Sequence, residues 1–194
     1  FLTARFSCRR GLRSKRTGAT VRRFCRISVL TKRILIDDMV IFLNKAVFSD
    51  CGQIHKMQVS AFTELLEKYR DVDTNPASES LEKIQNKFNQ SFTDYYFIML
   101  DETKIGVVRV VRLSDTICRI SPMFILPEYQ NNGYAQLALS AVEKLYPNAD
   151  EWQLDTIKEE SKLCHLYEKC GYIPTGKEEV IKDGMTIAYY SKKV

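Results

Sequence analysis

The sequence lacks the residue patterns that bind zinc or form a disulfide framework. Its six cysteines include no C-x-x-C pair, and its two histidines, His55 and His165, lie far apart. Structural zinc sites need closely spaced ligands, and small disulfide-rich domains need paired cysteines. We therefore expect no metal, and reduced thiols in a cytoplasmic protein. The cysteines are Cys8, Cys25, Cys51, Cys118, Cys164 and Cys170.

Long apolar runs are also missing. The longest, such as the segments ISVL and VIFL, fall far short of the roughly 20 residues that cross a membrane. Two phosphate-binding patterns, G-x-x-x-x-G-K-[ST] and G-x-G-x-x-G, are absent as well. The sequence therefore predicts a soluble protein with no membrane partner, and it excludes P-loop nucleotide hydrolysis and Rossmann dinucleotide binding.

Acidic residues are missing from the first 36 residues, which hold eleven of the 29 Lys and Arg residues. The rest of the chain carries the other 18 against all 24 acidic residues, so we expect this body not to bind nucleic acid. The basic segment has three interpretations: an organelle-targeting segment, a nucleic-acid-binding arm, or sequence upstream of a start at Met39. We expect residues 1–38 to lie outside the fold and residues 39–194 to form one domain.

With 194 residues and 45% hydrophobic composition, the chain can build one core. After a strand at 40–47, apolar residues recur at helical spacing over 49–70. A second helix is predicted to open at Asn75, its cap, with Pro76 in the first helical position. Its inward residues are expected to be Leu81, Ile84 and Phe88, and those of the first helix Ile54, Met57, Ala61, Phe62, Leu65, Leu66 and Tyr69.

From residue 95 onward, β-branched and aromatic residues predict strands at 95–100, 105–113 and 116–126. A helix at 134–145, a strand at 151–157, a helix ended by Gly171 and a hairpin turning at 182–184 follow. Because a helix between two strands is a crossover, strands 119–126 and 152–157 should be parallel neighbours. The pattern predicts an α/β (α+β) fold with a mostly antiparallel sheet flanked by helices. The inward residues of the last two helices are expected to be Leu137, Ala138, Ala141, Val142, Leu145, Leu163, Leu166, Tyr167 and Cys170.

The segment QNNGYA, residues 130–135, joins a strand to a helix. The start of a helix leaves backbone N–H groups without partners and carries partial positive charge, so it can hold a phosphate or pyrophosphate. Gly133 allows close approach of a ligand, and the small Ala135 keeps the first turn open. Many strand-to-helix turns contain a glycine for steric reasons only, so the steric interpretation also stays open at this point.

Two segments together resemble a known family. The stretch ILPEYQNNGYAQLAL is similar to the acetyl-CoA-binding signature Q/R-x-x-G-x-G/A of the GNAT superfamily of N-acetyltransferases, and LYEKCGYIPTG resembles that family's second marker. The resemblance spans residues 39–194 and implies the GNAT fold, with a splayed pair of parallel strands at the cofactor site. It implies transfer of an acetyl group from acetyl-CoA to a primary amine, in a small molecule or a peptide, by direct attack in a ternary complex.

The resemblance also assigns roles to residues. It places the pyrophosphate of coenzyme A on the backbone amides of the glycine turn, and it places the pantetheine arm along the preceding strand. A backbone N–H near Phe124 or Ile125 would then stabilise the oxyanion. Tyr167 is the expected general acid, because a phenol can protonate the departing thiolate, and Asp155 or Glu128 is the expected base. The turn residues are Gln130, Asn131, Asn132, Gly133, Tyr134 and Ala135, and the strand residues are Met123, Phe124 and Ile125.

Other interpretations of these residues stay open. Tyr167 also fits a core aromatic residue, and Asp155 and Glu128 also fit structural acids. The family often carries an asparagine early in the second-motif helix, where this chain has Glu160 and Ser161, and this departure puts one pantetheine contact in doubt. His165 is expected to face outward.

The function has one alternative of a different class, a non-catalytic acyl-CoA-binding or regulatory module of the same fold. In this family the acceptor pocket is shaped by the segment between the first two helices, here 70–92, and by the final hairpin. Neither segment contains an obvious recognition motif, so the acceptor cannot be named from the sequence. The sequence is also compatible with a homodimer.

Overall fold

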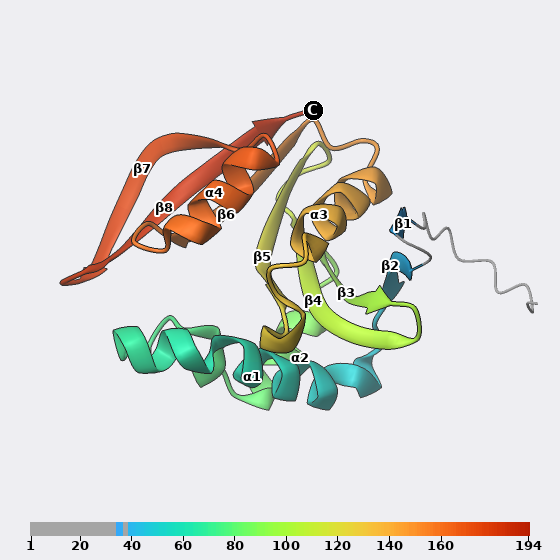
Figure 1. Cartoon of the computed structure of the whole chain (residues 1–194), viewed down its shortest axis with the longest axis horizontal. Coiled ribbons are helices and arrows are strands. Elements are labelled where there is room, and N and C mark those ends of the chain that lie inside the picture. The colour runs from blue at the N-terminus through green and yellow to red at the C-terminus, as the bar shows by residue number, and fades with distance from the viewer. Residues whose placement is uncertain (1–33, 37–38) are drawn as a thin grey trace, which may run out of the picture. The chain divides into compact units, whose positions relative to one another are not determined.

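The computed structural model describes residues 34–36 and 39–194, which form an eight-stranded sheet with flanking helices (Figure 1). The strands are β1 (Ile34–Ile36), β2 (Met39–Lys45), β3 (Thr93–Leu100), β4 (Thr103–Arg112), β5 (Ile117–Ile125), β6 (Glu151–Ile157), β7 (Ile173–Lys182) and β8 (Met185–Lys193). The helices are α1 (Cys51–Tyr69), α2 (Leu81–Phe88), α3 (Tyr134–Leu145) and α4 (Ser161–Lys169), with short 3-10 helices η1 (Phe48–Asp50), η2 (Pro76–Ser78) and η3 (Pro127–Tyr129). In this part of the chain, no helix is long and apolar enough to cross a membrane.

The strand order in the sheet is β1-β2-β3-β4-β5-β6-β8-β7. Neighbouring strands run antiparallel except β5 and β6, which are parallel. α3 forms the crossover between these two strands, as a parallel connection requires. The expected fold class, a mostly antiparallel sheet with one parallel pair, is therefore confirmed.

Each face of the sheet has its own apolar core. On one face, residues of α3 and α4 such as Val142 and Tyr167 pack with Val108 and Trp152. On the other face, residues of α1 and α2 pack with Phe97, Val107 and Phe124. Because side chains alternate along a strand, each central strand contributes to both cores. On β6, the face opposite Trp152 therefore carries Gln153 and Asp155.

The predicted inward faces of α3 and α4 are confirmed, because every residue named for them lies in or against the core. The predicted face of α1 is fully buried only in its first half. Ile54 and Met57 are buried, whereas Phe62, Leu65 and Tyr69 are half-buried. The second half of α1 thus leaves part of its apolar face outside the core.

The predicted start of the second helix is wrong. Asn75 does act as a cap, since its side chain accepts a hydrogen bond from the Ala77 amide at 2.8 Å, but the helix it caps is the short η2. α2 begins later and is capped by Ser80, whose Oγ accepts from the Lys83 amide at 3.2 Å. Two successive caps split this segment, and apolar spacing alone does not reveal the break.

A short strand, β1, precedes the expected domain boundary at Met39, and the boundary itself stays a prediction. Ile34 pairs with Ile41, and Ile36 pairs with Met39, so β1 extends the sheet beyond β2. An apolar run next to an edge strand can satisfy that edge by pairing with it, which explains the extension. The rest of the expected arm, residues 1–33 and 37–38, lies outside the described residues, and its role stays a prediction.

Candidate functional site

β5 and β6 lie side by side over only part of their lengths. Their register joins Ile117 to Glu151 and ends where Arg119 meets Gln153. Beyond that point β5 stays paired with β4 as far as Ile125, and β6 stays paired with β8 as far as Ile157. The two strands therefore part after Arg119, and Figure 1 shows the resulting gap in the sheet. We call this place the strand gap.

The ladder between β4 and β5 identifies the backbone groups that face the strand gap. The Leu126 amide donates to the Ile105 carbonyl at 2.8 Å, which makes this a hydrogen-bonded pair. Such pairs alternate with non-hydrogen-bonded pairs in an antiparallel ladder. The N–H of Phe124 therefore points toward β4, whereas those of Met123 and Ile125 point toward the gap.

The turn between β5 and α3 carries a row of free backbone donors. Within the described residues, the five amides from Asn131 to Ala135 make no hydrogen bond. The next two, of Gln136 and Leu137, donate to the Gly133 carbonyl at 3.1 and 3.3 Å. Consecutive free N–H groups at the start of a helix form an anion site, and the helix dipole adds to it.

Two residues in left-handed conformation shape this turn, Asn131 with φ 63° and Gly133 with φ 78°. A Cβ on Gly133 would meet nothing within 4 Å, so glycine serves its backbone conformation and leaves the space beside it open. The side chains of Gln130 and Asn132 hold the turn in place. They donate to the carbonyls of Ile125 and Gln130, each at 2.9 Å.

Tyr167 lies on α4 with its ring buried between Tyr172 and Tyr190, whose ring centroids are 6.2 and 6.3 Å away. Its hydroxyl makes no hydrogen bond with the described residues. Among those residues only the Trp152 indole nitrogen is both fully enclosed and without a partner. Burial raises the pKa of the Tyr167 phenol, and the Asp155 carboxylate raises it further.

The two candidate bases occupy different surroundings. Asp155 accepts a hydrogen bond from Arg119 Nη2 at 2.5 Å, across the point where β5 and β6 part. Glu128 lies on η3, is exposed, and makes no hydrogen bond or ion pair with the described residues. The structure thus places Asp155 beside the strand gap, while Glu128 remains on the surface after β5.

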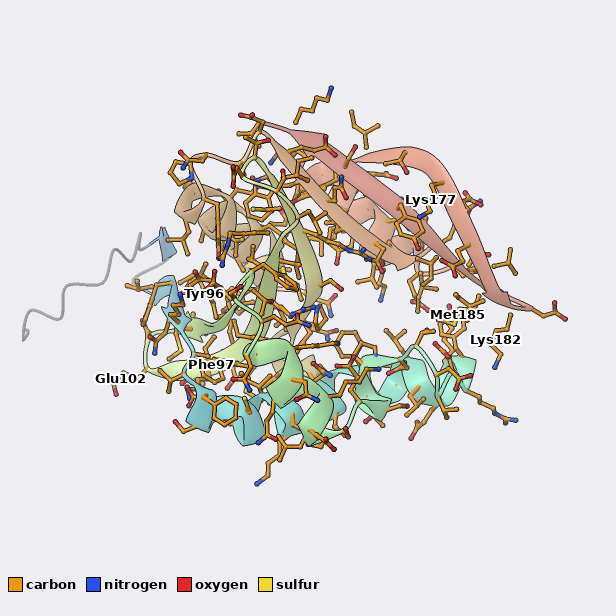
Figure 2. All side chains as sticks on the ribbon, turned by 180° about the vertical axis from the view of Figure 1, so that it is seen from behind. Tyr96, Phe97, Glu102, Lys177, Lys182 and Met185 are labelled. Atoms are coloured by element: carbon orange, nitrogen blue, oxygen red, sulfur yellow. The ribbon has the colours of Figure 1, made fainter. Side chains whose placement is uncertain are left out.

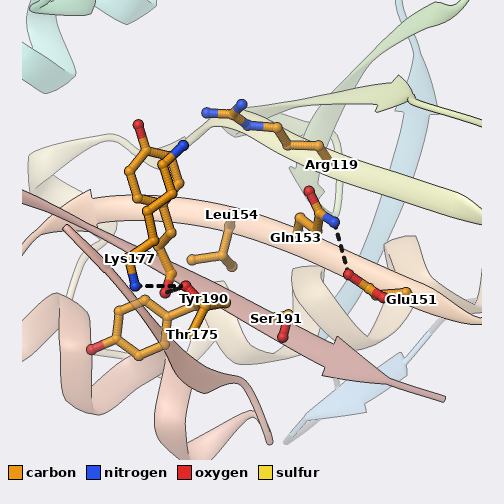
Figure 3. Close-up of a pocket in the computed structure, with 9 residues that line it drawn as sticks. Arg119, Glu151, Gln153, Leu154, Thr175, Lys177, Tyr190 and Ser191 are labelled. Atoms are coloured by element: carbon orange, nitrogen blue, oxygen red, sulfur yellow. Dashed lines mark hydrogen bonds between the residues drawn. The ribbon is translucent and has the colours of Figure 1, made fainter. Parts of the chain in front are cut away.

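A pocket of about 370 Å³ adjoins Arg119 on the face of β6 that carries Gln153 (Figure 3). Its wall includes Lys177 of β7, whose ammonium lies 4.1 Å from the ring centroid of Tyr189. Thr175 and Ser191 add hydroxyl groups. The pocket therefore combines charged, polar and aromatic groups beside the strand gap.

The sequence departure at the start of α4 has a structural consequence. Glu160 is the N-cap residue of α4, and its Oε1 accepts hydrogen bonds from Lys68 Nζ at 2.5 Å and Tyr69 Oη at 2.6 Å. Its carboxylate thus faces the end of α1. Ser161 and His165 are exposed, the latter as predicted.

Arg109 in β4 is a residue that the sequence reasoning missed. It is 8% exposed, and its guanidinium donates to Thr93 Oγ1 and the Ser121 carbonyl at 2.9 Å and to Gln90 Oε1 at 3.1 Å. Burial lowers its pKa. The bond to Ser121 holds β5 where its ladder with β4 is irregular, just after β5 and β6 part at Arg119. A single arginine inside the apolar segment IGVVRVV was the signal for this role.

Comparisons with known proteins agree with this architecture. The family model described as the acetyltransferase (GNAT) family matches residues 59–172. No curated protein matches the chain at a significant level. The fold is similar to a spermidine N-acetyltransferase from Vibrio cholerae, solved with CoA and spermine, at TM-score 0.64 and 18% identity over 79% of this chain and 95% of the other.

It is also similar to RimL, a ribosomal L7/L12 alpha-N-protein acetyltransferase solved with coenzyme A, at TM-score 0.66 and 12% identity over 84% of this chain and 98% of the other. At such identities these likenesses show the fold alone. The family match covers more than half of the chain, and it contains both the glycine turn and Tyr167. The chain therefore belongs to the GNAT acetyltransferase family.

Proposed function

We propose that this protein is an N-acetyltransferase that transfers the acetyl group of acetyl-CoA to a primary amine by direct attack in a ternary complex. The observation that carries the proposal is the run of five free amides, Asn131 to Ala135, placed directly after the strand gap. A pyrophosphate is an anion that such a row of donors fits. Acetyl-CoA, the acyl donor of this family, supplies an acetyl thioester.

The binding residues follow from the backbone geometry. The amides of Asn131, Asn132, Gly133, Tyr134 and Ala135 hold the pyrophosphate, while the side chain of Gln130 fastens the turn to β5. Met123 and Ile125 offer backbone groups to the pantetheine arm, because their N–H groups face the strand gap. Ile125 is the donor we assign to the acetyl carbonyl, since the Phe124 amide is turned toward β4.

Tyr167 serves as the general acid in this proposal. Its phenol carries its proton at neutral pH, as a tyrosine with a pKa of about 10 or higher does, and its hydroxyl has no bonded partner among the described residues. The surrounding tyrosine rings fix its orientation. Its role is to give a proton to the departing thiolate.

Asp155 is the base we favour over Glu128. It lies beside the strand gap, and its Oδ1 is held by Arg119, which fixes the carboxylate in place. An acceptor amine arrives protonated and must lose a proton before attack, either to a carboxylate or to water. Glu128 lacks any comparable support.

The acceptor is a small-molecule or peptide amine in this proposal. One structural relative is named for spermidine and another for a ribosomal protein α-amine, and their low identity does not decide between these classes. The pocket lined by Arg119, Gln153 and Lys177 is the acceptor site that we favour, because it adjoins both the strand gap and the final hairpin. A cytoplasmic location and a homodimer stay predictions.

The test is release of coenzyme A from acetyl-CoA in the presence of spermidine, spermine, amino acids, aminoglycosides and short peptides. We expect at least one amine to raise the rate at least tenfold above hydrolysis. Tight binding of coenzyme A by calorimetry without turnover of any amine would favour the non-catalytic module instead. Absence of coenzyme A binding would reject both functions.

A further inference from the structure

The end of α1 is tied to the far side of the strand gap by a polar cluster, which we call the clasp: Lys68, Tyr69 and Glu160. Both donors reach the same oxygen of Glu160. Lys68 and Tyr69 are the last residues of α1, and Glu160 follows β6, 92 and 91 residues away in the chain. Since α1 packs on Phe124 of β5, the clasp connects elements on the two sides of the gap.

A second contact supports the same connection. Lys182, at the tip of the β7–β8 hairpin, donates from Nζ to the carbonyl of Arg70 at 3.2 Å. Arg70 is the left-handed C-cap residue of α1, so this bond also reaches the helix end. Figure 2 shows Lys182 and Met185 at the hairpin tip, next to that end of α1.

The clasp differs from an ordinary surface ion pair. The Glu160 side chain is 20% exposed, although that of Lys68 is 54% exposed. Burial by itself raises the pKa of Glu160, but hydrogen bonds from Lys68 and Tyr69 outweigh it and lower the pKa. The Tyr69–Glu160 bond is thus a charge-assisted contact at a half-buried residue, the kind that stabilises more than an exposed pair.

The second half of α1 has few other anchors. Leu65 and Leu66 are only half-buried, and Phe62 meets the Phe124 ring edge-on at 5.6 Å between centroids. Phe124 belongs to the part of β5 that borders the strand gap. The position of this half-helix therefore determines the shape of the wall beside Phe124.

We propose that Glu160 is a positioning residue that holds the second half of α1 against the ring of Phe124 at the strand gap, so that its loss weakens acceptor binding and spares coenzyme A binding. The acceptor part of this inference rests on the proposed function. The cofactor part has a geometric basis, because no clasp residue is bonded to the turn at 131–135.

Hydrogen exchange of the full chain tests the clasp without any acceptor. Glu160→Ala and Tyr69→Phe should speed amide exchange in residues 62–70 about tenfold to hundredfold, the change expected from losing a charge-assisted hydrogen bond. Glu160→Gln keeps an oxygen that can accept the hydrogen bond from Tyr69. Its amide exchange rate in residues 62–70 should therefore lie between those of Glu160→Ala and the parent protein. Glu67→Ala, an exposed acid on the same helix end without a bonded partner in the described residues, is the matched control. Unchanged exchange in Glu160→Ala would overturn the proposal.

Calorimetry and kinetics then separate the two sides of the gap. In Glu160→Ala the Kd of coenzyme A should stay within twofold, while KM rises at least fivefold for an amine that supports turnover, tested first with spermidine and a short peptide. Equal weakening of coenzyme A binding would place Glu160 on the cofactor side and overturn the proposal. If the parent protein acetylates none of the amines, that result counts against the proposed function. The role of Glu160 is then decided by the amide exchange rates and by the affinity for coenzyme A.

Discussion

A Cβ added to Gly106 of β4 would lie 2.3 Å from the carbonyl oxygen of Phe124 in β5. Atoms cannot approach this closely, so any side chain at position 106 would displace the β5 backbone. Gly106 pairs with Ile125, the residue whose amide faces the strand gap. The lack of a side chain at position 106 therefore lets β5 lie close to β4, and this fixes the position of the β5 backbone groups that we assign to cofactor binding.

Gly106→Ala should destabilise the protein by about 1–3 kcal/mol, the usual cost of overpacking. It should also weaken coenzyme A binding several-fold, because β5 must move. Urea unfolding and calorimetry measure the two effects. Gly52→Ala is the control, since a Cβ there meets nothing within 4 Å and alanine favours the helix. Normal coenzyme A affinity in Gly106→Ala would contradict the assignment of this strand segment.

Gly133→Ala should weaken coenzyme A binding about tenfold, because a left-handed conformation is unfavourable for alanine and its relaxation would redirect the free amides. The matched control is Gly176→Ala in β7, which has φ 82° and equally open space. Both substitutions should cost about 1 kcal/mol of stability. Equal affinities of the two variants for coenzyme A, measured by calorimetry, would remove the turn from the binding site.

Tyr167→Phe should lower kcat at least about 100-fold, the scale of general acid catalysis, and leave the Kd of acetyl-CoA within twofold. Stability should change little, because the lost hydroxyl has no bonded partner among the described residues. Tyr172→Phe removes a hydroxyl that donates to Glu143 Oε1 at 3.0 Å in the same ring cluster. That control should lose about 1 kcal/mol of stability and keep its kcat. An unchanged kcat in Tyr167→Phe would reject the acid role.

Asp155→Asn should reduce kcat/KM about 100-fold at neutral pH and flatten its rise with pH, if this carboxylate takes the proton of the acceptor amine. Glu128→Gln makes the same chemical change at an exposed residue and should leave the profile intact. A full pH–rate profile of both variants shows which of Asp155 and Glu128 acts as the base. Retention of the parent profile in both would indicate that water removes the proton.

Stability should depend on pH through Asp94. Burial by itself raises its pKa, but Lys45 and Tyr146, as hydrogen-bond donors, and the charge of Arg112 lower it overall. A carboxyl whose pKa is lower in the folded state stabilises the fold above its unfolded pKa of about 3.9, and this contribution disappears as pH falls through the folded pKa. Asp94→Asn should therefore cost about 2 kcal/mol at pH 7.

The difference in the free energy of unfolding between Asp94→Asn and the parent should shrink steadily below about pH 4, where the carboxyl of the parent becomes protonated. Urea unfolding at several pH values measures it. Asp115→Asn, at an exposed residue without a bonded partner in the described part of the chain, should match the parent throughout. A constant penalty for Asp94→Asn at every pH would show that charge is not the source of its contribution.

Local patterns predicted most elements, and they offered an anion site as one interpretation of the turn. The stripe that contains Ala138 and Val142 indicated the buried side of α3, and the glycine before it indicated an anion site, because both signals depend on neighbours in the chain. The same reasoning failed between Asn75 and Leu81, where two caps compete over a short distance. It also missed Arg109, whose partners come from other elements.

The sequence by itself determined the order of the elements, the parallel crossover and the position of the glycine turn, because periodicity, caps and turn residues act within a few residues of chain. Only the tertiary structure decided that Asp155 meets Arg119, that Glu160 meets Tyr69, and that the Ile125 amide faces the strand gap. These relationships depend on strand register and on packing between distant segments, which no local pattern specifies.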